Sequence, residues 1–111
     1  MASTPSYLVI HTRDPLAGGR DGGVDPLVEA LAAGAPTTVV LAQNAVLAAR
    51  RGSGAAESVA RLASSARVLA DDFSLHERGI RADELVGGVV PAAMEEVVDL
   101  LMAGGCRAIW R

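Results

Sequence analysis

The residues that could do chemistry gather where three short apolar runs end. These runs, residues 7–12, 37–42 and 67–70, are predicted to be strands. The polar side chains at their carboxyl ends are His11, Gln43, Asn44, Asp71 and Asp72. Ligands of open parallel sheets bind outside the carboxyl ends of the strands, so these side chains would share one rim. We expect this rim to be a ligand site or an interface.

Each of these side chains also has a structural interpretation. Asn44 and Asp72 are good helix N-caps, because their side-chain oxygens accept hydrogen bonds from the first free amides of a helix. Gln43 could satisfy backbone groups at its strand end. His11 could act as a base or be a structural histidine. The sequence leaves these alternatives open.

Arg78 is a further candidate for the rim, because it ends a short helix predicted over residues 73–78. An arginine followed by a glycine, here Gly79, is typical of a helix C-terminus. The Gly-rich segment 18–23 lacks the spacing and the GK[ST] ending of a phosphate loop, so we expect a flexible loop there. The two histidines, the cysteine and the carboxylates show no metal-ligand spacing. We therefore expect neither a metal nor a cofactor.

Cys106 is the only cysteine, so the chain has no internal disulfide and no multi-thiolate zinc site. It stands at the start of the last predicted strand, at the opposite edge of the sheet from the rim. Four or five strand residues at about 3.3 Å each put it roughly 13–17 Å from Asp71 and Asn44. Arg107 could activate the thiolate. Cys106 is interpreted as a structural thiol, with persulfide carriage as the alternative.

Helical segments alternate with the strands and would position these residues. The predicted helices span residues 26–34, 45–51, 55–64, 73–78 and 92–103. Pro26 and Pro91 each fit a helix start. The last helix is expected to turn four apolar side chains inward: Val97, Val98, Leu101 and Met102. Further strands are expected over 89–90 and 107–110. This order predicts a three-layer α/β fold with a mainly parallel five-stranded sheet and helices on both faces.

Composition limits the function classes. The chain has 111 residues, of which 50% are hydrophobic, so we expect one domain over residues 1–111. The net charge is −3, and arginines supply all 10 basic residues, which excludes a phosphate-binding stripe for nucleic acid. No apolar run is long enough to span a membrane. The N-terminus does not have the pattern of a signal peptide, so we expect a cytoplasmic protein.

Three segments resemble the DsrE/DsrF/DsrH family of sulfur-relay proteins. They are VVLAQNAVLAAR, RVLADDFSLHERGI and the final AIWR. More narrowly, the order Gln43–Val46, then Asp72–Phe73, then Arg78–Gly79, then Trp110 is similar to the TusB/DsrH branch. The resemblance covers residues 8–110. Segments 18–23 and 52–57 depart from the pattern of the family.

The resemblance implies a flavodoxin-like fold of the DsrE type and oligomers of two, three or six related subunits. It also implies sulfur carried as a cysteine persulfide, with the acceptor cysteine at the end of the third strand. Residues 69–72 here contain no thiol, and their two carboxylates would repel an incoming thiolate. The TusB/DsrH branch also lacks that cysteine. We therefore expect a non-catalytic subunit or scaffold of sulfur relay, whose partners are itself or cysteine-bearing paralogues.

Two other functions remain as alternatives. One is a stand-alone α/β domain that binds a small ligand through His11, Asn44 and Asp72. The other is a persulfide carrier that uses Cys106. The sequence favours a role without catalysis.

Overall fold

The computed structural model describes residues 5–14 and 24–111, and the Gly-rich segment 18–23 lies outside them. Five strands form one sheet in the order β4-β3-β2-β1-β5, and every neighbouring pair is parallel. The strands are β1 (Ser6–His11), β2 (Thr37–Leu41), β3 (Arg67–Asp71), β4 (Val89–Ala92) and β5 (Cys106–Trp110). The predicted α/β class and parallel sheet are confirmed.

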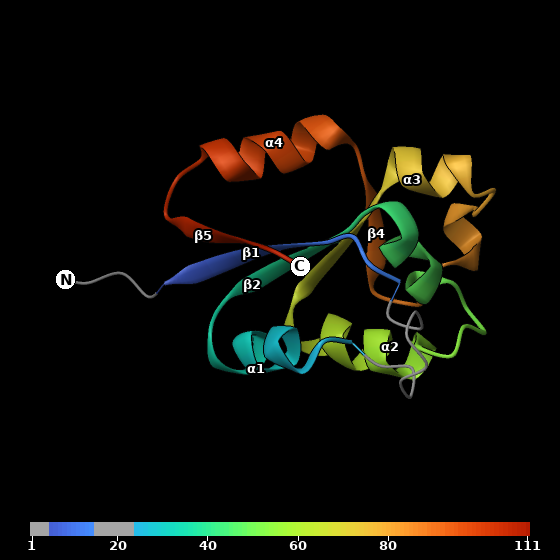
Figure 1. The fold of residues 1–111 in the computed structure, drawn as a ribbon, viewed down its shortest axis with the longest axis horizontal. Helices are drawn as coiled ribbons and strands as arrows, with labels where there is room; N and C mark the ends of the chain where they lie inside the picture. Colours follow the sequence, from blue (N-terminus) through green and yellow to red (C-terminus); the bar gives the residue numbers. More distant parts are fainter. Residues whose placement is uncertain (1–4, 15–23) are drawn as a thin grey trace.

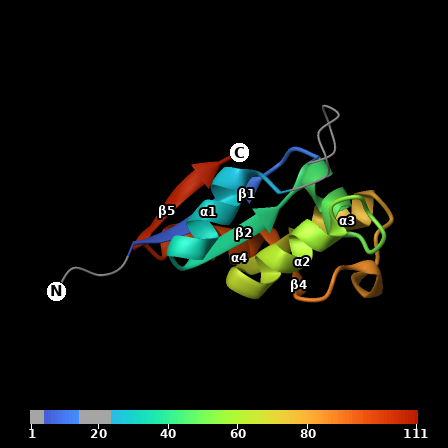
Figure 2. The same cartoon turned by 90° about the horizontal axis from the view of Figure 1, so that it is seen from below.

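The helices cover both faces of this sheet (Figure 1). On one face lie α1 (Pro26–Gly34) and α2 (Ala56–Ser65), and on the other lies α4 (Met94–Met102). Figure 2 shows α1 and α2 side by side across the near face of the sheet. The chain adds β2, β3 and β4 in one direction from β1, and α4 then carries it back to β5 on the other side of β1. Because crossovers between parallel strands are right-handed, this reversal of direction places α4 on the face opposite α1 and α2.

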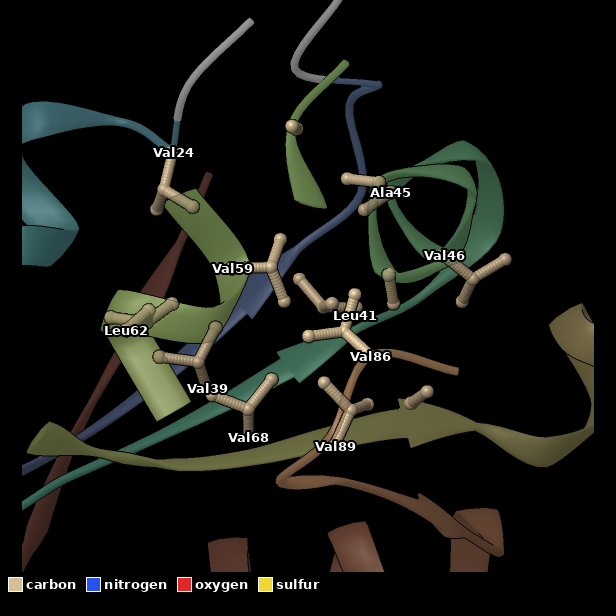
Figure 3. Packing of buried hydrophobic residues seen from close by; sticks show 14 of the residues in the cluster. Val24, Val39, Leu41, Ala45, Val46, Val59, Leu62, Val68, Val86 and Val89 are labelled. Carbon is tan, nitrogen blue, oxygen red and sulfur yellow. The ribbon is translucent and has the colours of Figure 1, made fainter. Parts of the chain in front are cut away.

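The face under α1 and α2 holds the larger core. Alternate residues of β2 and β3, including Val39 and Val68, point toward α2, where Val59 and Leu62 meet them (Figure 3). The short 3₁₀ helix η1 (Gln43–Ala49) and the segment after η2 (Ala82–Glu84) extend the same cluster. The core therefore runs from the sheet into the connections at its carboxyl edge.

The opposite face is packed less completely. Leu8, Ile10, Val40 and Leu69 point toward α4, and the helix covers them with one buried side chain, Val97, and the partly buried Leu100. The prediction that Val98, Leu101 and Met102 face inward is therefore wrong.

The apolar side of α4 is wider than the sheet can cover. The sheet contacts the edge of the helix that carries Val97 and Leu100, three residues apart. Glu96 forms an ion pair with Arg67 of β3, with Nη2 and Oε2 3.1 Å apart, which is consistent with this rotation of the helix. Four apolar side chains of α4 consequently face solvent: Met94, Val98, Leu101 and Met102. We call these four residues the α4 surface.

Two further element predictions need correction. Pro91 does not open the last helix but lies within β4, which is an edge strand and therefore tolerates a residue without an amide proton. The helix predicted over residues 45–51 is the 3₁₀ helix η1, starting at Gln43. Four of its small side chains are buried: Ala45, Val46, Ala48 and Ala49.

The start of α1 is formed as the sequence predicted. Pro26 occupies the first turn, and the carboxylate of Asp25 caps the helix by accepting a hydrogen bond from the Leu27 amide at 2.9 Å. None of the helices in the described ranges has the length and apolar character required to cross a bilayer.

Candidate functional site

The end of β3 is closed by a buried carboxylate. Asp71 is the N-cap of α3 (Asp72–Glu77), and its Oδ2 accepts hydrogen bonds from the Ser74 amide at 3.1 Å and from Ser74 Oγ at 2.5 Å. The interpretation of Asp72 as the N-cap is therefore wrong. Asp72 is the first helical residue and is exposed, because the strand continues one residue further than predicted.

Gln43 connects the end of β2 to this cap. Its amide donates a hydrogen bond to Ser74 Oγ at 2.9 Å, so one hydroxyl links the ends of β2 and β3. Gln43 has a φ of 54°, the only positive value among the described residues other than glycine. This left-handed conformation costs about 1–3 kcal/mol at a non-glycine residue and persists only where surrounding contacts impose it. The hydrogen bond to Ser74 is one such contact.

Asn44 contacts Arg78, and this contact joins η1 to the end of α3. Asn44 Oδ1 accepts hydrogen bonds from Arg78 Nη2 at 3.0 Å and from Nε at 3.3 Å. The same guanidinium donates through Nη1 to the Ser74 carbonyl at 3.2 Å. Asn44 is therefore not an N-cap as predicted, because η1 begins at Gln43, two residues before the predicted start, with Ala42 at the cap position. Arg78 does end its helix, and Gly79 follows with a φ of 64°.

These contacts define what we call the strand-end cluster: Gln43, Asn44, Asp71, Ser74 and Arg78. It brings together four of the six residues predicted for the rim. Ser74 and Asp71 are almost completely buried, so neither the hydroxyl nor the carboxylate is accessible to a substrate. Asp71 Oδ1 has no hydrogen-bond partner within the described ranges. The cluster contains no thiol, and its contacts fix the connections at the carboxyl edge of the sheet.

Asp72 lies outside this cluster. It lines a separate hollow of about 430 Å³ between α3 and the start of α4, together with Phe73, His76, Met94 and Glu95. Acidic side chains flank two exposed apolar ones there. The hollow adjoins the α4 surface through Met94.

His11 lies in a different place again, at the carboxyl end of β1. Its ring is almost completely buried, and Nδ1 has no hydrogen-bond partner among the described residues. A cavity of about 400 Å³ adjoins it, lined by His11, Thr12, Arg13, Asp25, Trp110 and Arg111. Burial lowers the pKa of His11, and the charges of Arg111 and Arg13 lower it further, although Asp25 and the Arg13 backbone act in the opposite sense. The imidazole is therefore neutral near pH 7.

Asp25 and Arg111 are residues of this cavity that the sequence analysis did not single out. Asp25 Oδ2 accepts a hydrogen bond from Arg111 Nε at 2.7 Å, and it forms an ion pair with Arg111 Nη2 at 2.5 Å. Burial would raise the pKa of Asp25, but the Leu27 amide and Arg111 outweigh it and lower that pKa overall. An aspartate before Pro26 was a recognisable cap signal. The contact with Arg111 depends on β5 lying beside β1, which the sequence alone did not specify.

Cys106 occupies the first position of β5, paired with Ser6 at the opposite end of β1 from His11. It is partly buried, and its thiol lies 3.6 Å from the Leu100 carbonyl. It lines a cavity of about 610 Å³, together with Tyr7, Thr37 and Arg67. The thiol is thus separated from the strand-end cluster by the length of the strands. Within the described ranges, no group of three or more potential ligands could hold a metal ion.

Comparison with known proteins identifies the fold. No family model matches the chain, and no curated protein matches it. Among solved structures, the protein of unknown function MTH1491 from Methanobacterium thermoautotrophicum superposes with a TM-score of 0.74 at 19% identity, covering 98% of this chain and 100% of that one. The ychN protein from E. coli superposes with a TM-score of 0.68 at 17% identity, covering 96% and 99%. The chain therefore has the DsrE-like fold.

Proposed function

We propose that this chain is a non-catalytic DsrE-like subunit of a cytoplasmic sulfur relay, of the TusB/DsrH type. In this role it associates with copies of itself or with cysteine-bearing DsrE-like chains. The DsrE-like fold supports the general assignment, and the sequence resemblance supports the narrower branch.

The observation that carries the proposal is the chemistry at the end of β3. The resemblance places the acceptor cysteine there, and this chain has Asp71 and Asp72 instead. Asp71 is committed to the cap of α3 and to Ser74, and Asp72 adds a second carboxylate at the surface. An approaching thiolate or persulfide anion would be repelled by these charges. This arrangement favours a subunit that does not carry sulfur at this position. Its role would be to assist the transfer of sulfur between other chains.

The α4 surface supplies the contact for a partner. Its residues follow the spacing i, i+4, i+7 and i+8, which places them on one side of the helix. Met102 is 80% exposed and Met94 52% exposed. Contiguous apolar patches of this kind are typical of protein interfaces. Val90 and Phe73 add further exposed apolar side chains on β4 and α3.

Native mass spectrometry tests the association. The chain is measured alone and after co-expression with cysteine-bearing DsrE-like chains of the same organism. We expect a dimer or a larger assembly, and Leu101→Asp should dissociate it because a charge would be buried in the contact. Leu27→Asp is the matched control, since Leu27 is similarly exposed but lies on α1 across the sheet. A strict monomer that captures no such chain would contradict the proposal.

A second candidate, a persulfide carrier, is favoured by the position of Cys106. The thiol lines the 610 Å³ cavity, which Arg67 also lines, so a donor could reach it there. In the transfer step, the Cys106 thiolate attacks the outer sulfur of a donor persulfide. A new S–S bond forms at Cys106, the donor S–S bond breaks, and the donor leaves as its thiolate.

Mass spectrometry separates the two candidates. After incubation with a small-molecule persulfide, a carrier should gain about 32 Da, the mass of one sulfur atom, and Cys106→Ala should gain none. The non-catalytic subunit predicts no such gain for the wild-type protein under conditions that load a cysteine-bearing DsrE-like chain. Loading at Cys106 would therefore replace the first proposal by the second.

A further inference from the structure

The cavity beside His11 lies at the topological switch point of the sheet. From β1 the chain builds β2, β3 and β4 on one side, and β5 alone occupies the other side. The cavity is lined by residues that follow or end β1 and β5, together with Asp25 at the start of α1. In open α/β sheets, the crevice outside the carboxyl ends of the strands at such a reversal is where ligands bind.

The cavity is bordered by a buried polar atom that the described part of the protein leaves without a partner. His11 is 6% exposed, and its Nδ1 makes no hydrogen bond with a described residue. Buried polar groups normally have a partner, and an exception calls for a specific explanation. A neutral imidazole carries one N–H group, which can donate to a ligand in the cavity.

The charges around this atom favour an anion. Arg13 and Arg111 both line the cavity, and both act electrostatically on His11. The Asp25 side chain, which also lines the cavity, already accepts hydrogen bonds at both oxygens, from the Leu27 amide and from Arg111. It therefore orients Arg111. Arg13 is an exposed residue that lines the cavity, so its positive charge lies where a ligand would enter.

The backbone fixes the positions of these groups. The Arg111 amide donates to the Ile10 carbonyl at 2.8 Å, and the Thr12 amide donates to the Arg111 carbonyl at 3.0 Å. These two bonds hold the end of β5 against the end of β1. Arg111 is therefore held on both its main chain and its side chain before any ligand arrives, and such preorganisation reduces the cost of binding.

We propose that this cavity is a binding site for a small oxyanion, of the size of sulfate, phosphate or a carboxylate. Arg13 makes the main ionic contact, Arg111 makes the second, and His11 Nδ1–H donates a hydrogen bond. The site does not depend on the proposed role in sulfur relay, since it shares no residue with the strand-end cluster, the α4 surface or the cavity of Cys106.

The single tryptophan makes the site directly observable. Trp110 lines the cavity and is the only tryptophan in the sequence. Its fluorescence is followed during titration with sodium sulfate, sodium phosphate or sodium acetate, with sodium chloride at matched ionic strength as the reference. We expect a saturable change with at least one oxyanion that chloride does not reproduce. Comparison of sulfate and phosphate with acetate shows whether a tetrahedral or a planar anion fits better.

Two variants assign the binding to this cavity. Arg13→Gln should weaken binding about tenfold, as expected for the loss of one charge-assisted hydrogen bond. Arg61→Gln is the matched control, because Arg61 is an exposed arginine of α2 away from the cavity, and it should bind as the wild type does. Equal affinities of the wild type and Arg13→Gln would overturn the proposal, as would a response no larger than that to chloride.

A second measurement uses the two histidines. In nuclear magnetic resonance spectra, the ring nitrogen signals of His11 should move with sulfate, while those of His76 on α3 should not. His76 is an internal control in the same tube and needs no substitution. Equal shifts of both histidines would indicate a general salt effect and would contradict a site at His11.

Discussion

The two faces of the sheet differ in how completely they are covered. Under α1 and α2, 20 buried apolar residues form one cluster within the described ranges, whereas under α4 the corresponding cluster has six. Two helices and the connections at the carboxyl edge close the first face, and a single helix covers only the middle of the second (Figures 1 and 2). Elements of this chain close the first face, whereas the second leaves the α4 surface exposed.

The difference follows from the topology. The crossovers from β1 to β2 and from β2 to β3 place α1 and α2 on the same face, and the single return to β5 places α4 on the other, with α3 at the end of the sheet on the side of α4 (Figure 1). A five-stranded sheet is wider than one helix, whose diameter with side chains is about 10–12 Å. Exposed apolar residues at both edges, Val90 on β4 and Trp110 on β5, are a consequence of this geometry.

The largest expected effect comes from truncating the larger core. Leu62→Ala, on α2, removes a buried side chain from the larger cluster and should lower the free energy of unfolding by about 2–5 kcal/mol. Leu101→Ala, on α4, makes the same chemical change at a residue that is 39% exposed, and should cost under about 1 kcal/mol in the isolated chain. Urea unfolding measures both. Equal losses would mean that the two faces contribute alike to stability.

A smaller effect distinguishes the two adjacent aspartates at the carboxyl edge. Asp71→Ala removes the cap of α3 and should cost about 0.5–2 kcal/mol, with a further loss because Ser74 Oγ loses its acceptor. Asp72→Ala removes an exposed carboxylate from the first turn and should cost about 0.3–1 kcal/mol. Thermal unfolding of both variants, followed by circular dichroism, gives the order. A larger loss for Asp72→Ala would contradict the assignment of the cap.

The smallest expected effect is a pH dependence of the free energy of unfolding, caused by His11 on the face under α1 and α2. His11 follows Val9 by two residues, so it points to the same side of β1. Its pKa is lowered in the folded state, mainly by burial. Around the unperturbed pKa of about 6.5, the unfolded chain therefore binds more protons than the folded chain. The free energy of unfolding consequently falls as the pH decreases through that range.

Urea unfolding between pH 8 and about pH 5.5 measures this dependence, above the range in which most carboxylates titrate. The wild type should lose more stability on acidification than His11→Gln, which has no titrating ring. His76→Gln, at an exposed position of α3, should behave as the wild type. Parallel curves for the wild type and His11→Gln would show that His11 is not buried as a neutral ring.

The sequence was sufficient for features that are local or periodic. Strand and helix alternation gave the parallel α/β fold, and Pro26 and Gly79 marked ends that the structure places as predicted. The apolar residues of α4 span a wide side of the helix. Their spacing did not determine which of them would pack against the sheet. Pro91 was misassigned because a proline before a helix and a proline in an edge strand look alike until the strand order is known.

In the candidate sites too, local features could be predicted from the sequence and long-range contacts could not. Asp71 and Asp72 were both recognised, but a difference of one residue in the end of β3 decided which carboxylate is buried at the cap. The contact of Asn44 with Arg78 joins residues 34 apart in sequence, and that of Asp25 with Arg111 joins residues 86 apart. Such pairs are determined by the order of the strands and not by local spacing.

Pro91 in β4 has a consequence for how the protein can assemble. An edge strand offers its free amides and carbonyls to any other strand, which is how sheets extend into fibrils. A proline has no amide proton to give, so it interrupts this row of donors at the centre of a strand of only four residues. Extension of the sheet by pairing another strand with β4 is therefore disfavoured. Any contact between copies at this edge would depend on side chains and not on backbone hydrogen bonds.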